Sequence, residues 1–346
     1  YNVLGIDVNE SYIKSLNNKT FKTTEPLYEE YINNSNNLKA SSSLQEGLNF
    51  SNYIFILVPT PNGGGDRFYD HSILSNLLVK INNLNPKNKH FIIGCTVMPK
   101  YTDEVGNCLM EINNEKNNNT LSYNPEFVAQ GEIMKGFLKP DIVLIGTHSE
   151  EVSKKLTEIY TKTSENTPKF CIMKPLESEI VKISLNGFVT TKLSFANMIS
   201  DVCDTMGADK YTVLDSIGSD SRIGNRYFRP GYSFGGPCFP RDTRALKQVV
   251  DQENINSDLL KATTFYNEEH VNFQANQLLK ENKEIYVIEN VCFKEDNPVS
   301  IIEESAKLKI AKKLLENGKK VIIKDGKDMI QEVKKEYGNL FSYEIK

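Results

Sequence analysis

The stretch Tyr53-Ile-Phe-Ile-Leu-Val58 is an unbroken apolar run that stops at Pro59-Thr60-Pro61. A short run of this kind, bounded by turn residues, is typical of a strand that is buried on both faces. The same pattern, separated by polar and helix-compatible segments, recurs at residues 3–7, 91–95, 141–146 and 170–173. Apolar strands that alternate with helices predict an α/β fold with a parallel sheet over residues 1–175.

A different pattern begins near Glu177, where apolar residues recur at helical spacing as far as Met206. Gly187 is the one glycine or proline that interrupts this pattern. This predicts one long helix between two domains, with a face suited to a symmetric dimer. A glycine- and proline-rich loop and further helices follow, and then a strand, a helix and a strand at 285–288, 302–316 and 320–324. We therefore expect two Rossmann-like doubly wound domains joined by a long central helix and a helical region, with boundaries 1–175, 176–283 and 284–346.

The composition excludes several classes of protein. Its 346 residues carry a net charge of −4 with the basic residues scattered, which argues against a nucleic-acid partner. No apolar run approaches the roughly 20 residues that span a bilayer, so we expect no membrane segment. The six cysteines are far apart and show no disulfide framework, which favours a reducing compartment such as the cytoplasm. The four histidines lack metal-ligand spacing.

The asparagine-rich stretches 31–37 and 112–119 are typical of surface loops.

Asp7 follows the first apolar run. In dinucleotide-binding folds an acid at this place binds the adenosine ribose hydroxyls and favours NAD over NADP. The alternative is an aspartate that caps the next helix. The phosphate-binding GxGxxG motif belongs about 20 residues before such an acid, so we expect it, with its strand, to precede Tyr1.

Two further motifs, Val58-Pro-Thr-Pro61 and Gly94-Cys-Thr-Val-Met-Pro99, follow predicted strands, and a third, Ser122-Tyr-Asn-Pro-Glu-Phe127, forms a turn. The carboxyl ends of parallel strands are where open α/β sheets bind ligands. Glu126, on a turn fixed by proline, is suited to holding or deprotonating a water. The alternatives are ordinary turns and a solvated carboxylate.

Lys182 and Asn186 are four residues apart on the long predicted helix and therefore share a face. A positive charge and an amide aimed at one point can stabilise an oxyanion. A solvated pair on the polar side of the helix is the alternative.

Residues 230–242 read PGYSFGGPCFPRD. Pro240 is typical of a first helical position, so Cys238 is expected just ahead of a helix N-terminus, which favours the nucleophilic thiolate. Asp242 lies one turn further on, within reach of the same ligand. A buried packing cysteine is the alternative, but it would not require the neighbouring glycines.

Taken in order, these motifs resemble the UDP-glucose/GDP-mannose dehydrogenase family. The matching segments are GID, VPTP, CTVMP, NPEF, the Lys-x-x-x-Asn helix, DSRIGNRYFRPGYSFGGPCFPRD and CFKED. The resemblance implies oxidation of a sugar-nucleotide C6 alcohol to a carboxylate with two NAD. It implies that Cys238 forms a thiohemiacetal and then a thioester, that Lys182 and Asn186 stabilise oxyanions, and that Asp242, Glu126 and Thr96 handle proton transfer and hydrolysis through water.

The resemblance also implies the binding residues. Those for NAD are Asp7, Val58, Thr60, Thr96, Gln130 and Arg241. Those for the substrate are Phe127, Lys182, Asn186, Arg222, Tyr232, Phe234, Gly235, Gly236, Phe293 and Lys294. In this interpretation Gly231, Gly235 and Gly236 let backbone amides approach the sugar.

Three positions depart from the family pattern: Gln130 replaces a glutamate, Arg241 replaces a lysine, and Glu303 stands where many members carry an arginine. We expect UDP-glucose to be oxidised to UDP-glucuronate by a homodimer that pairs through the central helix. The alternative substrates are UDP-N-acetylmannosamine, UDP-N-acetylglucosamine and GDP-mannose. More distant alternatives are a two-electron hydroxyacid dehydrogenase and an inactive protein that binds sugar nucleotides.

Overall fold

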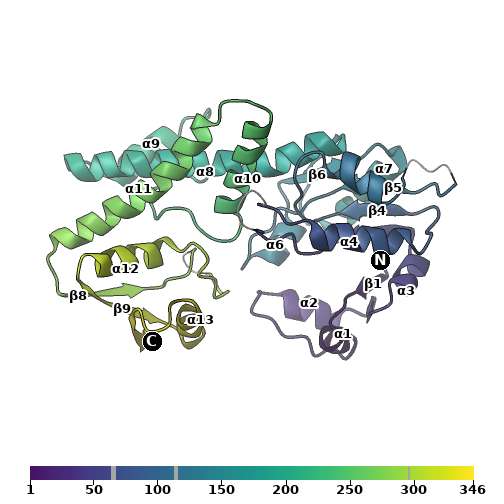
Figure 1. Ribbon diagram of the computed structural model, residues 1–346, viewed down its shortest axis with the longest axis horizontal. Coiled ribbons are helices and arrows are strands. Elements are labelled where there is room, and N and C mark those ends of the chain that lie inside the picture. Colours follow the sequence, from purple (N-terminus) through teal and green to yellow (C-terminus); the bar gives the residue numbers. More distant parts are fainter. Residues whose placement is uncertain (64–67, 113–115, 295–296) are drawn as a thin grey trace. The chain divides into compact units, whose positions relative to one another are not determined.

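A computed structural model describes residues 1–63, 68–112, 116–294 and 297–346 (Figure 1). The chain divides into two compact units, Tyr1–Lys182 and Ile183–Lys346, and helix α8 (Pro175–Met206) runs from the first into the second. The mixed α/β class with mainly parallel sheets is confirmed. The two later predicted domains, 176–283 and 284–346, lie almost wholly within the second unit, and the three-domain division stays a prediction.

The first unit contains a five-stranded sheet in the order β3-β4-β5-β6-β7. Its strands are β3 (Tyr53–Ile56), β4 (His90–Ile93), β5 (Thr120–Tyr123), β6 (Ile142–Gly146) and β7 (Lys169–Met173). A separate pair of parallel strands is formed by β1 (Val3–Ile6) and β2 (Leu38–Ser41).

The sequence predicted a parallel sheet, but the five-stranded sheet contains one antiparallel pair of strands. Strands β5 and β6 pair antiparallel, through Tyr123 and Gly146, while the other neighbours are parallel. The apolar run of β6 could not reveal this, because a strand buried on both faces carries no alternation that shows its direction.

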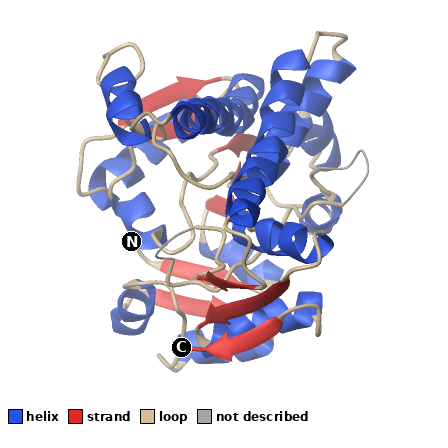
Figure 2. Cartoon of the chain, turned by 90° about the vertical axis from the view of Figure 1, so that its left-hand side faces the viewer, coloured by secondary structure: helices blue, strands red, loops and turns tan. Residues whose placement is uncertain are grey.

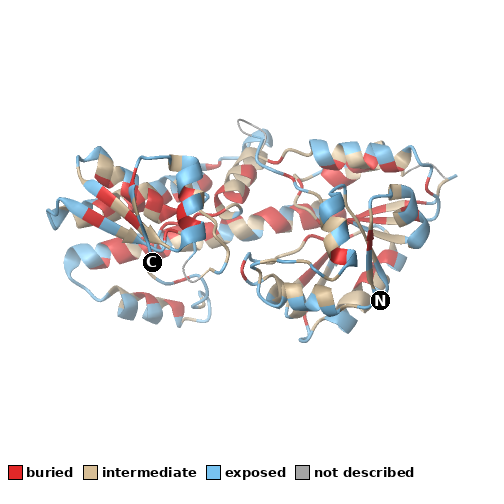
Figure 3. Ribbon diagram, turned by 90° about the horizontal axis from the view of Figure 1, so that it is seen from below, coloured by how far each residue is buried: buried red, intermediate tan, exposed pale blue. Residues whose placement is uncertain are grey.

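Helices cover both faces of this sheet. The helices of the first unit are α1 (Glu10–Asn17), α2 (Tyr28–Asn34), α3 (Leu44–Phe50), α4 (Ser72–Asn82), α5 (Asn107–Leu109), α6 (Ile133–Leu138), α7 (Glu150–Thr163) and the π-helix η1 (Tyr101–Gly106). Along β4, Phe91 and Ile93 pack with Leu74 of α4, whereas Ile92 packs with Leu156 of α7. Residues of both clusters are among those coloured as buried in Figure 3. Burial on both faces explains the unbroken apolar runs of β4 and β6. The same prediction is wrong for β3, because β3 is an edge strand of this sheet and its Phe55 is 41% exposed.

The asparagine-rich stretch from residue 31 to 37 is not a loop throughout, because α2 continues to Asn34. The side chain of Asn33 accepts from the backbone N–H of Phe21 (3.2 Å) and donates to its carbonyl (3.0 Å), which ties the helix to the preceding segment. In the second such stretch, residues 113–115 lie outside the described residues.

The second unit begins with helices and ends in a βαβαβ arrangement. Its elements are α9 (Lys210–Gly218), α10 (Phe239–Gln252), α11 (Asp258–Lys280), β8 (Ile285–Glu289), α12 (Ala306–Glu316), β9 (Lys320–Asp325), α13 (Lys327–Tyr337) and β10 (Ser342–Ile345). The three strands are parallel in the order β10-β9-β8, and Figure 2 shows them as red arrows beside the C-terminus. Helix α12 begins at Ala306 and not at 302, because the hydroxyl of Ser305 caps it by accepting from the N–H of Leu308 (3.3 Å).

Among the described residues, no helix is both long and apolar enough to cross a membrane. In the same part of the chain, no three His, Cys, Asp or Glu side chains are grouped so that they would hold a metal ion.

Candidate active site

The loops that follow β3, β4 and β5 lie at one edge of the first sheet, since these three strands are parallel. Val58 and Thr60 follow β3, and Thr96 follows β4. The hydroxyl of the buried Thr60 donates to the carbonyl of Thr96 (2.9 Å), which ties the two loops together. The fold therefore brings these three predicted cofactor residues to the same edge.

Asp7 follows β1 but does not cap the next helix. Asn9 is the N-cap of α1, with its side-chain oxygen accepting from the N–H of Tyr12 (3.1 Å). The Asp7 carboxylate accepts from the N–H of Asn9 (2.7 Å) and so closes the turn before the helix. The capping alternative is wrong, and a ribose-binding role for Asp7 stays a prediction.

The turn that carries Glu126 is held by buried polar groups. Asn124 donates to the carbonyl of Leu144 (2.8 Å) and accepts from the hydroxyl of Tyr160 (2.8 Å). The carboxylate of Glu126 accepts from the N–H of Val128 (2.7 Å). This bond engages one carboxylate oxygen within its own turn, which fixes the direction of the side chain.

Lys182 of α8 reaches the same turn. Its ammonium group donates to the carbonyl of Glu126 and lies 4.4 Å from the centroid of the Phe127 ring. The Lys182 side chain is buried, so the solvated alternative proposed from sequence is wrong for this residue. Gln130, a few residues on, is exposed, and its cofactor role stays a prediction.

Two supporting residues were missed from the sequence. The buried carboxylate of Glu179, on α8, accepts from the backbone N–H groups of Lys100 (2.7 Å) and Thr102 (2.8 Å), and burial raises its pKa. The ring of His71 accepts from the N–H of Met98 (3.3 Å), and burial lowers its pKa to about 4. Both hold the segment that follows Thr96. An acid within the apolar stripe of a long helix is the signal that could have revealed Glu179.

In the second unit, Cys238 occupies the N-cap position of α10, and Pro240 lies in the first turn, as predicted. The thiol is exposed, so the packing alternative is wrong. The N–H of Asp242 donates to the carbonyl of Cys238 (2.8 Å), which places the carboxylate one turn after the thiol. Asp242 is itself buried, and Arg241 donates to its Oδ1 (3.3 Å).

Asn186 of α8 donates from its amide nitrogen to Oδ2 of Asp242 (2.7 Å). The helices approach closely here because of Gly187, where an added Cβ would lie 2.6 Å from the Leu246 side chain of α10. This glycine, which looked like an interruption of the helix, thus allows two of the predicted catalytic residues to meet. Asn186 is half-buried and bonded to Asp242, so the alternative of a solvated residue is wrong here.

The glycines before Cys238 face another part of the chain. An added Cβ would lie 2.3 Å from the carbonyl oxygen of Glu304 at Gly235, and 2.5 Å from the Phe293 ring at Gly236. The N–H of Gly236 donates to the carbonyl of Glu303 (2.9 Å), so this amide is engaged within the protein. Close approach therefore does require glycine at positions 235 and 236. The groups that approach them in this structure are residues 303–304 and Phe293, whereas the sequence interpretation had the sugar in this place.

Residues 1–164 match the family model of the UDP-glucose/GDP-mannose dehydrogenase family, NAD binding domain, and residues 176–269 match that of its central domain. The chain belongs to the UDP-glucose/GDP-mannose dehydrogenase family. This confirms the resemblance read from the sequence, and it confirms NAD as the cofactor of the first domain.

Individual relatives agree with the family match. The UDP-glucose 6-dehydrogenase of Rickettsia bellii is 30% identical over 284 residues, which are 80% of this chain and 64% of that protein. The structure of a UDP-glucose dehydrogenase from Pyrobaculum islandicum matches with a TM-score of 0.88 and 27% identity, over 99% of this chain and 80% of that one. A UDP-D-ManNAc dehydrogenase from Pyrococcus horikoshii shares the fold, with a TM-score of 0.79 and 22% identity, over 94% of this chain and 78% of that one. The chain thus spans slightly under two thirds of the length of the Rickettsia bellii relative.

The remaining substrate residues expected in this dehydrogenase-family chain are spread along the second unit. Phe234 is buried and Tyr232 is partly exposed, with the ammonium of Lys307 4.8 Å from the Tyr232 ring centroid. The side chain of Arg222 is 85% exposed and holds Asp220 through two hydrogen bonds (2.9 and 2.7 Å). Lys294 is also exposed, and the last two residues of its motif, 295 and 296, lie outside the described residues. The substrate contacts of these residues stay predictions.

A pocket of about 350 Å³ lies in the second unit of this family member, lined by Leu193, Asn225, Arg226, Tyr227 and Arg229. Its two guanidinium groups suit an anionic ligand, because arginine binds phosphate through paired hydrogen bonds. Arg222 was predicted from the sequence as a substrate residue, whereas Arg226 and Arg229 were not. The signal was present, since three arginines fall within residues 222–229.

Proposed function

We propose that the protein oxidises the C6 alcohol of UDP-glucose to the carboxylate of UDP-glucuronate in two NAD-dependent steps. The observation that carries this proposal is the exposed Cys238 at the start of α10, with the buried Asp242 one turn later. A simple alcohol dehydrogenase needs no thiol, whereas oxidation beyond the aldehyde is made easier by a covalent intermediate.

The residues at the strand ends fit the cofactor. Asp7 offers a carboxylate that does not cap α1, and Thr60 and Thr96 lie at the carboxyl edge of the sheet. These residues are proposed to hold the ribose and the neighbouring part of NAD. When bound, NAD accepts the hydride in each of the two oxidations.

Cys238 is proposed to act between these oxidations. Its thiolate adds to the C6 aldehyde, forming a C–S bond, and the resulting oxyanion takes up a proton to give a thiohemiacetal. Loss of a hydride and a proton from this adduct leaves a thioester. Water then attacks the thioester carbon, the C–S bond breaks, and the sulfur leaves as thiolate. Alcohol, two NAD⁺ and water thus give carboxylate, two NADH and three protons.

Polar side chains of α8 and α10 are proposed to serve the charged intermediates. Asn186 has an amide suited to an oxyanion, and Lys182 adds a positive charge one turn earlier on the same helix. Asp242 is the proposed acceptor for the proton of the attacking water. Glu126 and Thr96 remain proposed for proton transfer through water, and their loops have the geometry described above.

A panel of sugar nucleotides tests the reaction. We expect two equivalents of NADH for each UDP-glucose consumed, and little NADH with UDP-N-acetylglucosamine, UDP-N-acetylmannosamine or GDP-mannose. One equivalent would indicate a two-electron dehydrogenase, and NADH with another sugar only would reassign the substrate. A protein that binds these nucleotides without producing NADH would contradict the catalytic proposal.

The homodimer predicted from sequence is also proposed. Phe188, Phe195 and Val202 recur every seventh residue on α8 with exposed fractions of 69%, 47% and 47%, a stripe that suits pairing with a second copy. Phe188→Glu with Phe195→Glu is expected to halve the mass measured by light scattering, while the exposed Phe50→Glu in α3 leaves it unchanged. A dimer that survives the double substitution would contradict this interface.

A cytoplasmic location is proposed as well, and the widely spaced cysteines of the sequence support it.

A further inference from the structure

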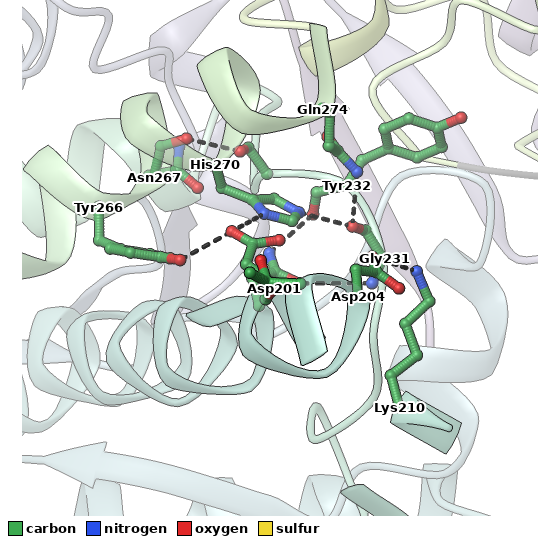
Figure 4. Close-up of polar contacts among 12 residues, drawn as sticks. Asp201, Asp204, Lys210, Gly231, Tyr232, Tyr266, Asn267, His270 and Gln274 are labelled. Atoms are coloured by element: carbon green, nitrogen blue, oxygen red, sulfur yellow. Dashed lines mark hydrogen bonds and ion pairs between the residues drawn. The ribbon is translucent and has the colours of Figure 1, made fainter. Parts of the chain in front are cut away.

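A buried aspartate and a buried histidine face each other behind the loop that leads to Cys238 (Figure 4). Nδ1 of His270, on α11, lies 2.9 Å from Oδ2 of Asp201 on α8, and the two side chains are 2% and 8% exposed. The hydroxyl of Tyr266 donates to the same carboxylate oxygen (2.7 Å). None of these three residues was assigned a function from the sequence.

The hydrogen bonds define the protons on His270. Its Nε2 lies 2.9 Å from the carbonyl oxygen of Gly231, which can only accept, so Nε2 carries a proton. Its Nδ1 faces Oδ2 of Asp201, which also accepts from the Tyr266 hydroxyl, so a donating Nδ1 suits this geometry. Oδ1 of Asp201 is buried and has no hydrogen-bond partner within the described ranges. A ring that donates from both nitrogens carries a positive charge, which would compensate the buried carboxylate of Asp201.

The charged and titratable groups around this pair come from three helices. Asp201 and Asp204 lie on α8, Lys210 on α9 and Tyr266 on α11. Lys210 is paired with Asp204 at 2.9 Å. Asp201 is the carboxylate in direct contact with the His270 ring.

His270 anchors the first residue of the glycine-rich loop. The carbonyl of Gly231 also accepts from the amide of Gln274, one turn along α11 (3.1 Å). From the opposite side, the buried Asn197 of α8 accepts from the N–H of Gly231 and donates to the carbonyl of Tyr232, both at 3.3 Å. The loop is therefore clamped between α8 and α11 at this end.

The clamp continues toward Cys238. The Asn267 side chain accepts from the N–H of Phe234 (2.9 Å) and donates to its carbonyl (3.0 Å). Further on, Gly236 is bonded to the carbonyl of Glu303. A displacement of Gly231 would thus reach the residues before the thiol through a short segment that is hydrogen-bonded at Gly231, Phe234 and Gly236.

We propose that His270, oriented and kept charged by Asp201, is a positioning residue for the sugar-nucleotide substrate. It fixes the Gly231 carbonyl and with it the loop that bears Tyr232 and Phe234. This inference rests on the proposed function, because the loop is taken to contact the substrate. The NAD-binding domain is formed by residues 1–164, whereas this loop carries predicted substrate residues, so we expect His270 to act on the sugar nucleotide.

Kinetics of three variants test the proposal. His270→Phe keeps a ring but donates no hydrogen bond, His270→Gln retains one donor, and His148→Gln removes an exposed histidine that is paired with Asp103 at 3.1 Å. We expect His270→Phe to raise KM for the sugar nucleotide on the order of tenfold, as for a lost charge-assisted hydrogen bond, with KM for NAD unchanged. His270→Gln should recover part of this loss, and His148→Gln should match the wild type. Equal changes in both KM values, or none, would overturn the proposal. If His270→Phe does not fold, His270→Gln must still show the selective rise in KM.

Nitrogen-15 spectra of the histidine rings supply a readout that does not depend on activity. We expect both ring nitrogens of His270, identified by the signals lost in His270→Gln, to be protonated in the wild-type protein. An unprotonated nitrogen would overturn the ion pair. A wild type that oxidises no sugar nucleotide would instead contradict the proposed function, while the spectra would still decide the state of His270.

Discussion

The amide of Asn186 donates to the carboxylate of Asp242 at 2.7 Å, which joins two helices through residues that are 56 positions apart in the sequence. Asp242 is buried and follows Cys238 by one helical turn. The contact holds both a proposed oxyanion donor and a proposed base in defined positions.

Asn186→Asp places two carboxylates face to face in a buried position. We expect the free energy of unfolding to fall by about 2 kcal/mol, because a bonded donor is replaced by a like charge. The exchange of both residues, Asn186→Asp with Asp242→Asn, restores one amide and one carboxylate and should recover most of the stability. Urea unfolding measures both effects. A double variant as unstable as the single one would show that the pair does not act through this bond.

Cys238→Ala should abolish net NADH formation, with a loss of at least about 10³-fold, because no covalent intermediate can form. The side chain is exposed, so thermal stability should hardly change. Cys108→Ala removes another exposed thiol, in the first unit, and serves as the control in the same NADH assay. Full turnover by the Cys238→Ala protein would favour a two-electron dehydrogenase that needs no thiol.

Gly236→Ala should destabilise the protein by about 1–3 kcal/mol. Gly236 has φ +81°, where side chains are strained, and the new Cβ would lie 2.5 Å from the Phe293 ring. Gly231→Ala is the matched control, since no heavy atom lies within 4 Å of its Cβ position, and we expect its effect to stay within about 0.5 kcal/mol. Equal denaturation midpoints for the two variants would argue against the close packing of the loop on Phe293.

Because His71 is partly buried, we expect the protein to lose stability in acid. Its pKa is lowered to about 4 by burial, whereas an unfolded histidine titrates near 6.5. Between these values the unfolded chain binds the extra proton, so this contribution to stability is complete above about pH 6.5 and is lost as the pH falls toward 4. The loss is on the order of 2 kcal/mol after allowance for partial exposure.

Unfolding free energies measured across this pH range check the contribution of His71. His71→Phe keeps an aromatic ring between Tyr69 and Tyr101 and should flatten the pH dependence. An unchanged slope in this variant would assign the acid sensitivity to other groups.

Much of the architecture could be predicted from local patterns. The apolar runs of β3, β4 and β6 and the helical periodicity of α8 identified these elements, because the burial of apolar side chains leaves a direct trace in the sequence. Pro240 likewise indicated where α10 begins and placed Cys238 at its start.

Short strands escaped prediction. Strands β2, β5 and β10 have four residues each, and polar side chains interrupt all of them. They are strands because neighbouring strands of the same chain offer them backbone hydrogen bonds. The local composition of a segment does not show whether such a neighbour is present. The antiparallel pairing of β5 with β6 was hidden as well, because the apolar run of β6 does not show the direction of the strand.

By itself, the sequence determined the class of fold, the long helix, the cysteine at a helix start and the family. Only the tertiary structure decided which polar groups meet. Asp242 meets Asn186 where Gly187 lets α8 and α10 approach closely, and His270 meets Asp201 while its other nitrogen contacts the carbonyl of Gly231. Periodicity records which side of a segment is buried, whereas the partner it meets there depends on packing between residues that are far apart in the chain.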